Sequence, residues 1–90
     1  MEKFYYVYMI RCADGTLYTG STDDVERRFQ LHSNGKGAKY TRGRGPLTLV
    51  YSEKLPTWSD ALKREHAIKK LTRAQKEQLL ANYTKSEADL

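Results

Sequence analysis

The first apolar stretch of the chain has no polar face. Residues 4–12 (FYYVYMIRC) are rich in aromatic and β-branched side chains, and these occupy both sets of alternate positions. This pattern is typical of a strand that is covered on both faces, so we expect it at the centre of a sheet. The ADG sequence that follows can make a hairpin turn, and TLYTG, beginning at Thr16, is predicted to return as a second strand.

The loop of this hairpin can have two or three residues, and a register shift of one residue moves side chains to the opposite face of the sheet. A two-residue loop would pair Arg11 with Tyr18 and leave Tyr8 and Tyr18 on opposite faces. A three-residue loop, with Gly15 in the left-handed conformation, would pair Ile10 with Tyr18 and set Tyr8 diagonally beside it. The local turn chemistry allows both.

Three capping patterns after the hairpin predict three helices. In each pattern, a Ser or Thr is followed three residues later by a second polar side chain. That side chain can accept a hydrogen bond from the backbone N–H of the Ser or Thr. The pairs are Ser21 with Asp24, Thr57 with Asp60 and Thr72 with Gln75, and the predicted helices cover about residues 22–33, 58–71 and 73–83. Residues 34–46 (NGKGAKYTRGRGP) are predicted to form a loop, here called the basic loop, and residues 47–53 a third strand.

The order β, β, α, β, α, α predicts one α+β domain over residues 1–84, with a three-stranded sheet flanked by helices, followed by a polar tail, residues 85–90, that we expect to fray. A chain of 90 residues leaves no room for a second domain. It has no run of about 18 apolar residues and no signal-peptide pattern, so we expect a soluble cytoplasmic protein with no membrane partner. One cysteine and two histidines exclude an intrachain disulfide and disfavour a four-ligand structural zinc site.

The basic residues are clustered. The chain has 16 Lys and Arg against 11 Asp and Glu, with six basic residues between Arg27 and Arg44 and six more between Lys63 and Lys76. A net charge of +5 can serve solubility alone. The clustering, together with seven tyrosines, favours an anionic polymer as the partner, and nucleic acid is the simplest choice.

Two charged residues occupy positions where apolar residues are expected. Arg28 falls on the same side of its predicted helix as Val25 and Phe29, and Glu65 falls in the apolar stripe that begins at Trp58. An unpaired buried charge costs several kcal/mol or more, so such a residue needs a water-filled cleft or a strong partner. A Glu65–Lys69 surface ion pair, or an arginine stem lying over apolar surface, would account for either residue alone. Both together, beside tyrosines on a central hairpin, favour a functional site.

These residues occur in the order of a known pattern. Tyr6-Val7-Tyr8, ten residues from Tyr8 to Tyr18, Tyr18-Thr19-Gly20, STDDVERR and a late glutamate-bearing helix together resemble the GIY-YIG nuclease domain, from about Phe4 to Leu80. NGKGAKYTRGR and ALKREHAIKKL are similar to segments of its small single-domain bacterial members. The resemblance implies a three-stranded antiparallel sheet and selects the three-residue hairpin loop. Tyr6 stands where the family name has glycine, and Asn82 is the one candidate for the family's late asparagine.

The resemblance also implies a catalytic site for phosphodiester hydrolysis, with Mg²⁺ or Mn²⁺ as the cofactor and no small-molecule cofactor. Glu65 is the expected metal ligand, because Mg²⁺ prefers hard oxygen donors. Arg28 would donate to the phosphate oxygens. A tyrosine is the expected base, with Tyr8 the first candidate and Tyr18 the second, provided that a nearby cation favours the phenolate. His32 would brace the arginine or take part in proton transfer.

The expected partner is DNA, single-stranded or structured. The candidate contacts, besides Gly20 for close backbone approach, lie in the basic loop: Lys36, Lys39, Tyr40, Arg42 and Arg44. No element looks built to read the major groove, so we expect little sequence specificity. The leading hypothesis is a metal-dependent endonuclease acting in DNA repair or on structured DNA. The alternatives are a nucleic-acid-binding module that cuts poorly and a protein-interaction module.

Overall fold

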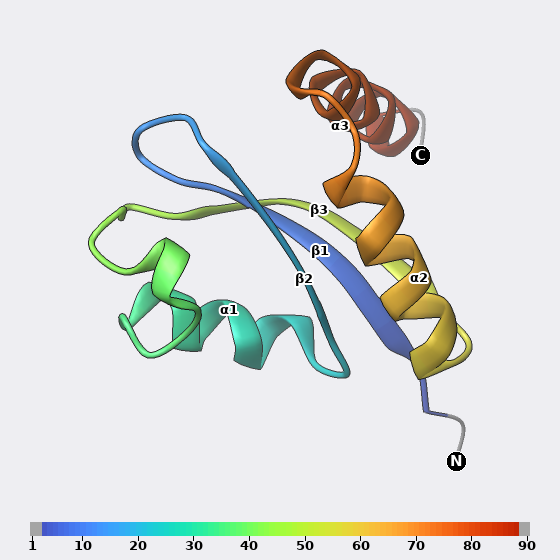
Figure 1. Cartoon of the computed structure of the whole chain (residues 1–90), viewed down its shortest axis with the longest axis horizontal. Helices are drawn as coiled ribbons and strands as arrows, with labels where there is room; N and C mark the ends of the chain where they lie inside the picture. Colours follow the sequence, from blue (N-terminus) through green and yellow to red (C-terminus); the bar gives the residue numbers. More distant parts are fainter. Residues whose placement is uncertain (1–2, 89–90) are drawn as a thin grey trace.

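The order of elements is the predicted one, β-β-α-β-α-α (Figure 1). The computed structural model describes residues 3–88, without the side chains of Tyr40 and of residues 84–88. The elements are β1 (Tyr5–Arg11), β2 (Leu17–Thr22), α1 (Val25–Ser33), a short 3₁₀ helix η1 (Lys39–Thr41) in the basic loop, β3 (Thr48–Leu55), α2 (Trp58–Lys69) and α3 (Arg73–Ala88).

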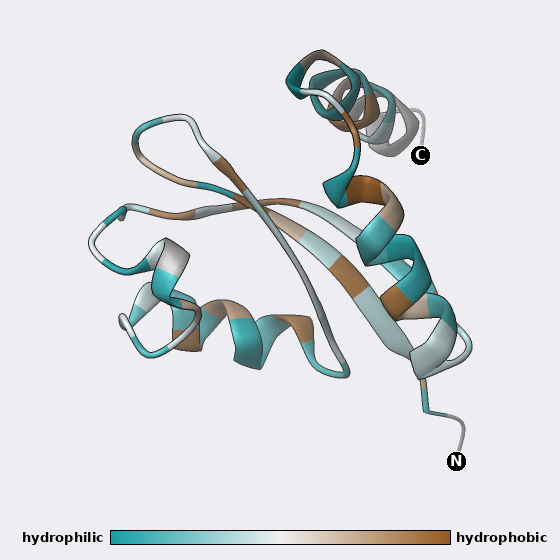
Figure 2. Cartoon of the chain, in the orientation of Figure 1, coloured by the Kyte–Doolittle hydropathy of each residue, from teal (hydrophilic) through white to brown (hydrophobic). Residues whose placement is uncertain are grey.

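The sheet is antiparallel with the order β2-β1-β3, which confirms the prediction that the first strand is central. Residues Val7 to Ile10 of β1 are buried on both faces. Val7 and Met9 join the main core with Ala61 and Ile68 of α2, whereas Tyr8 bonds to a side chain of α1. The two faces of β1 therefore have different roles: one forms the core and the other carries a candidate site. Figure 2 shows hydrophobic residues along β1 and on part of α2, and mainly hydrophilic residues around the basic loop.

The hairpin adopts the three-residue loop. Ile10 pairs with Tyr18, and Tyr8 pairs with Gly20. Gly15 has φ 86°, a left-handed value that suits glycine, and its N–H donates to the Cys12 carbonyl at 2.9 Å. This register brings Tyr8 and Tyr18 to the same face of the sheet.

The first helix begins later than predicted, and its capping prediction was wrong. Ser21 and Thr22 remain in β2, where they pair with Val7 and Tyr6, so helix α1 starts at Val25. Asp24 is the N-cap and accepts from the Arg27 N–H at 3.1 Å. Pairing with β1 outcompetes the local capping pattern, and the Ser21 side chain is left to bond elsewhere.

The other two capping predictions are confirmed. Thr57 accepts from the Asp60 N–H at 3.1 Å, and Thr72 and Gln75 bond reciprocally at 2.9 and 3.2 Å. Helix α2 ends at Lys69, short of the predicted residue 71, and α3 continues to Ala88, past the predicted end at residue 83. Strand β3 is shifted to Thr48–Leu55 from the predicted 47–53. Residues 89 and 90 of the predicted tail lie outside the described residues.

No helix within residues 3–88 combines the length and the hydrophobicity needed to cross a bilayer.

Candidate active site

Three aromatic rings meet between the sheet and α1. The hydroxyl of Tyr8 lies 2.9 Å from Nε2 of His32. The Tyr18 ring centroid is 5.1 Å from that of His32 and 6.3 Å from that of Tyr8. Tyr8 and His32 are each only 1% exposed. The hairpin register and the last turn of α1 together create this cluster.

The basic loop holds the other side of the His32 ring. Nδ1 of His32 lies 2.9 Å from Oγ1 of Thr41, and that hydroxyl donates to the Ala38 carbonyl at 2.9 Å. Because the Thr41 proton is used in this way, the contact between Nδ1 and Thr41 is a bond in the tautomer with Nδ1–H, in which Nε2 accepts from Tyr8. The Ala38 N–H also points at Nδ1, at 3.3 Å, and donates only in the other tautomer, in which Nε2–H donates to the Tyr8 oxygen. The shorter contact favours the first tautomer, in which the proton of Tyr8 has an acceptor.

Sequence reasoning missed Thr41 and Gly37, which hold this loop in place. Thr41 is 2% exposed, unusual for a hydroxyl in a basic glycine-rich loop. A Cβ at Gly37 would collide with the His32 ring and lie 2.9 Å from its Cα. The one signal in the sequence was the spacing of glycines around Lys36, which marked a loop but not its contact with His32.

The buried cluster keeps Tyr8 and His32 uncharged near neutral pH. Burial raises the pKa of Tyr8 to about 12, and Arg28 opposes this rise only in part. Burial, and then repulsion from Arg28, lowers the pKa of His32 below 6.5. A neutral imidazole is consequently next to a neutral phenol, and the expected shift of Tyr8 toward the phenolate does not occur in this state.

The raised pKa of Tyr8 predicts a loss of stability at alkaline pH. The folded state holds the phenol proton more tightly than the unfolded state, whose tyrosine has a pKa near 10.0. The free energy of unfolding should therefore fall as pH rises from 10 toward 12, by roughly 2 to 3 kcal/mol over the full interval. Urea unfolding at pH 9 and pH 11 measures the first half of this fall, about 1.4 kcal/mol. Tyr8→Phe should show a smaller fall, and equal falls in the two proteins would contradict the assignment.

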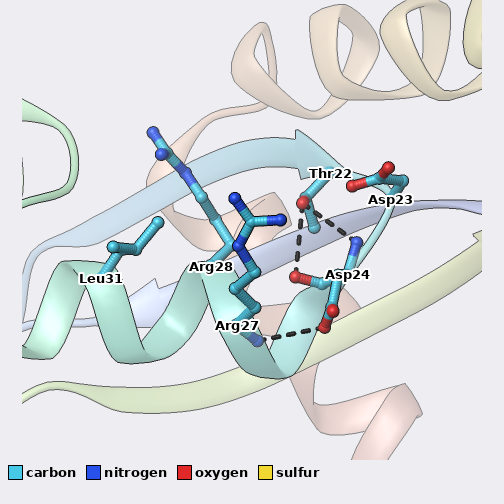
Figure 3. A pocket seen from close by; sticks show the side chains of 6 residues that line it. All are labelled: Thr22, Asp23, Asp24, Arg27, Arg28 and Leu31. Atoms are coloured by element: carbon cyan, nitrogen blue, oxygen red, sulfur yellow. Dashed lines mark hydrogen bonds between the residues drawn. The ribbon is translucent and has the colours of Figure 1, made fainter.

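Arg28 projects from α1 beside the end of β2. Thr22, Asp23, Asp24, Arg27, Arg28 and Leu31 line a pocket there, and Figure 3 shows both arginines on the early turns of α1. Asp24 is occupied as the helix cap, and Asp23 pairs with Lys3 at 3.1 Å. Arg28 is half-buried and influences both Tyr8 and His32 electrostatically. Among the described residues, it is the basic group that affects the pKa values of both Tyr8 and His32.

Glu65 approaches from α2, on the other side of the edge strand β2. Its Oε1 accepts from the Ser21 hydroxyl, and its Oε2 pairs with Nζ of Lys69 at 2.7 Å. The Glu65 side chain is 19% exposed, and its charge acts on Tyr8 by raising the pKa of that phenol. The ion pair with Lys69, which the sequence offered as the alternative to a functional site, is therefore present, and the carboxylate also acts electrostatically on Tyr8.

The donor set around Glu65 fits a magnesium-type ion held by few protein ligands. Within the described part of the chain, no three His, Cys, Asp or Glu side chains gather as a metal site. Mg²⁺ typically keeps several waters and binds through one or two carboxylates together with substrate phosphates. A single carboxylate that already attracts the Lys69 ammonium suits that mode and does not suit a dedicated zinc or calcium cage.

Gly20 is required where the tyrosines approach the backbone. A Cβ at this position would lie 2.6 Å from the Tyr8 hydroxyl oxygen and 3.1 Å from the Tyr18 ring. Gly20→Ala should therefore lower the free energy of unfolding by about 1 to 3 kcal/mol, the usual cost of overpacking. Urea unfolding measures it. Gly45→Ala is the matched control, because no described atom lies within 4 Å of its Cβ. Equal effects of the two substitutions would contradict this packing.

The other predicted residues are distributed differently. Lys36, Lys39 and Arg42 are exposed on the basic loop, while Arg44 pairs with Asp14 of the hairpin turn at 2.6 Å. The side chain of Tyr40 lies outside the described part of the structure. Asn82 is exposed on α3 and accepts from Gln78 at 3.2 Å, with no described bond to the aromatic cluster.

Comparisons with known proteins agree with this architecture. Residues 4–78 match the family described as the GIY-YIG catalytic domain. The chain is 56% identical to a UPF0213 protein of Natronomonas pharaonis, over 93% of this chain and 99% of the relative, and 54% identical to a UPF0213 protein of Cronobacter sakazakii, over 98% and 92%.

Two solved structures are also similar. The solution NMR structure of a UPF0213 protein from Bacillus halodurans has a TM-score of 0.58 and 50% identity, covering 87% of this chain and 83% of that one. The solution NMR structure of a protein from E. faecalis has a TM-score of 0.62 and 46% identity, covering 93% and 92%. The family match spans both tyrosines, Arg28, His32 and Glu65, and the chain belongs to the GIY-YIG family.

Proposed function

We propose that this protein is a metal-dependent endonuclease that hydrolyses DNA phosphodiester bonds. The observation that carries the proposal is the buried Tyr8–His32 pair, whose tyrosine is acted on electrostatically by both Arg28 of α1 and Glu65 of α2. A base, a phosphate-binding cation and a metal-binding carboxylate are the groups that this reaction needs. The GIY-YIG match supports the same reaction class.

Glu65 would hold Mg²⁺ or Mn²⁺, in exchange for its pair with Lys69. When bound, the ion supplies a Lewis acid for the phosphate. Ser21 keeps the carboxylate in position by donating to Oε1. Arg28 donates to the phosphate oxygens as negative charge shifts in the transition state, and its planar set of N–H groups matches their geometry.

Tyr8 and His32 together handle the proton of the attacking water. A phenol with a pKa of about 12 is already protonated at neutral pH and cannot act as a base alone. It can take the water proton at its oxygen while its own proton passes to Nε2 of His32, which is 2.9 Å away and neutral. Tyr18, packed against both rings, orients the water.

The substrate class follows from the surface around the site. The basic loop carries exposed Lys36, Lys39 and Arg42 and is anchored to His32, so a phosphate backbone bound to the loop would continue toward the aromatic cluster. Such contacts carry no sequence information, so we propose that the DNA is cut with little sequence specificity. We further propose that the DNA is single-stranded or structured, and that the protein acts in the cytoplasm in DNA repair or processing.

A second candidate is a nucleic-acid-binding module that cuts poorly. It is favoured by the Glu65–Lys69 pair, which occupies the carboxylate that would hold the metal, and by the high pKa of Tyr8, which disfavours the phenolate. The third candidate, a protein-interaction module, draws no comparable support from the site.

A cleavage assay separates the candidates. Labelled single-stranded, duplex and branched DNA are incubated with the protein in Mg²⁺, in Mn²⁺ and in excess EDTA. The proposal expects cleavage that requires the divalent ion and is strongest on single-stranded or branched DNA. Binding without cleavage in either ion would identify the binding module, and cleavage in EDTA would reject the metal mechanism.

A further inference from the structure

A second pocket lies next to the one that contains Arg27, and it joins α1 to α2 across the end of β2. Its lining residues are Tyr5, Ser21, Thr22, Asp23, Arg28 and Trp58. Ser21 and Arg28 also belong to the candidate active site, so the pocket is continuous with it. Trp58, the first residue of α2, forms the far wall.

Trp58 is held in place and yet open to the solvent. Its ring makes an edge contact with Tyr5, at 5.3 Å between centroids and 63° between planes. It is still 43% exposed, although it is the largest apolar side chain of the chain and the only tryptophan. An exposed aromatic ring in a pocket lined by polar groups is typical of a binding site.

Trp58 and Glu65 are two helical turns apart on the same side of α2. Seven residues correspond to about 10.5 Å along the axis and about 700° of rotation, which is nearly two full turns. A nucleic-acid strand covers that distance in about three nucleotides at 3.4 Å each, and in fewer when it is extended. A strand whose phosphate is bound at Glu65 and Arg28 would therefore bring a nearby base to Trp58.

We propose that Trp58, supported by Tyr5, stacks on an unpaired base one to three nucleotides from the scissile phosphate. This inference rests on the proposed nuclease function and specifies its substrate. The pocket suits a base because the rings of Tyr5 and Trp58 line it, and Arg28 in the same pocket can bind the adjoining phosphate. A paired base does not offer its face to a side chain, so the subsite selects single-stranded, frayed or branched positions.

Charge argues for this occupant over a second copy of the chain. Arg28 lines the pocket, and the chain carries a net charge of +5, so two copies repel each other while a polyanion is attracted. The ring face provides the stacking surface and Arg28 the counter-charge for the adjoining phosphate.

The single tryptophan makes the test direct, because its emission reports on this pocket alone. Labelled oligothymidine and a blunt hairpin with the same number of phosphates are titrated into the protein in EDTA, so that binding is measured without cleavage. Oligothymidine should quench the Trp58 emission strongly and the hairpin only slightly. Anisotropy of the labelled DNA shows independently how much DNA is bound.

Two variants complete the experiment. Trp58→Ala should weaken oligothymidine binding about 5- to 150-fold, as expected for one lost stacking contact, and Trp58→Phe should restore part of it. Leu62→Ala is the matched control, because Leu62 is 45% exposed on the same helix but is not among the residues that line the pocket. Circular dichroism confirms that each variant is folded.

Several outcomes would overturn the subsite. DNA that binds without quenching Trp58, Trp58→Ala binding as tightly as Leu62→Ala, or no DNA binding at all would each do so. Emission that changes with protein concentration in the absence of DNA would identify the pocket as an interface between copies. Quenching by oligothymidine in a protein that fails to cleave DNA in Mg²⁺ and Mn²⁺ would support the subsite and reject the nuclease.

Discussion

Glu65→Gln is expected to lower the rate of DNA cleavage in Mg²⁺ by roughly 100- to 1,000-fold, the range seen when one charge-stabilising group is removed from an active site. Glutamine has nearly the same shape and can still accept from Ser21, but it carries no charge with which to bind a divalent ion. The fold should persist, because Glu65 lies outside the hydrophobic core. Single-turnover cleavage of a labelled strand measures the rate.

Glu53→Gln is the matched control for this substitution. Glu53 also accepts from a hydroxyl, that of Tyr51 at 2.6 Å, and also pairs with a basic side chain of α2, Arg64 at 3.0 Å. It takes no part in the proposed site, so its cleavage rate should stay within about threefold of wild type. Cleavage that survives in Glu65→Gln would show either a contaminating nuclease or a different metal ligand.

Arg28→Ala should have an effect of similar size, a fall of about 100- to 1,000-fold in the single-turnover rate at saturating DNA. The guanidinium of Arg28 is expected to bind the phosphate as negative charge develops on the phosphate oxygens. Arg28 is the one described arginine that lines both pockets. Arg28→Lys should recover only part of the rate, because an ammonium keeps the charge and loses the planar pair of donors.

Arg27→Ala separates local chemistry from overall charge. Arg27 is the preceding residue of α1, is exposed, and lines only the first of the two pockets that Arg28 lines. Its removal should weaken DNA binding modestly and reduce the salt dependence of binding, with little change in the rate at saturating DNA. Equal rate losses in the two variants would reduce the role of Arg28 to general attraction of the backbone.

Much of this arrangement could be predicted from the sequence, because local patterns determine it. The aromatic strand, the glycine in the hairpin turn and two of the three capping pairs specify elements that the structure contains. Arg28 and Glu65 stood out because they interrupt apolar stripes, a conflict between charge and position that a periodic helix makes visible. The family resemblance then selected the hairpin register that a local reading left open, and that register is present.

The remaining features depend on contacts between distant residues. Ser21 resembles a helix cap locally, but strand pairing with Val7 keeps it in β2, and it bonds to Glu65 instead. Thr41 closes on His32 only because the basic loop folds back onto α1. The pKa of Tyr8 depends on how completely the cluster is buried. No periodic pattern or short motif encodes these three features.

In the proposed mechanism a divalent ion binds at Glu65, beside Ser21, and not at Asp23 and Asp24. The most direct measurement is paramagnetic broadening of the amide signals of ¹⁵N-labelled protein when Mn²⁺ is added. Metal binding at Glu65 predicts the strongest broadening around Glu65 in α2 and Ser21 in β2, and its loss in Glu65→Gln. Broadening confined to Asp23 and Asp24, or unchanged in the variant, would contradict it.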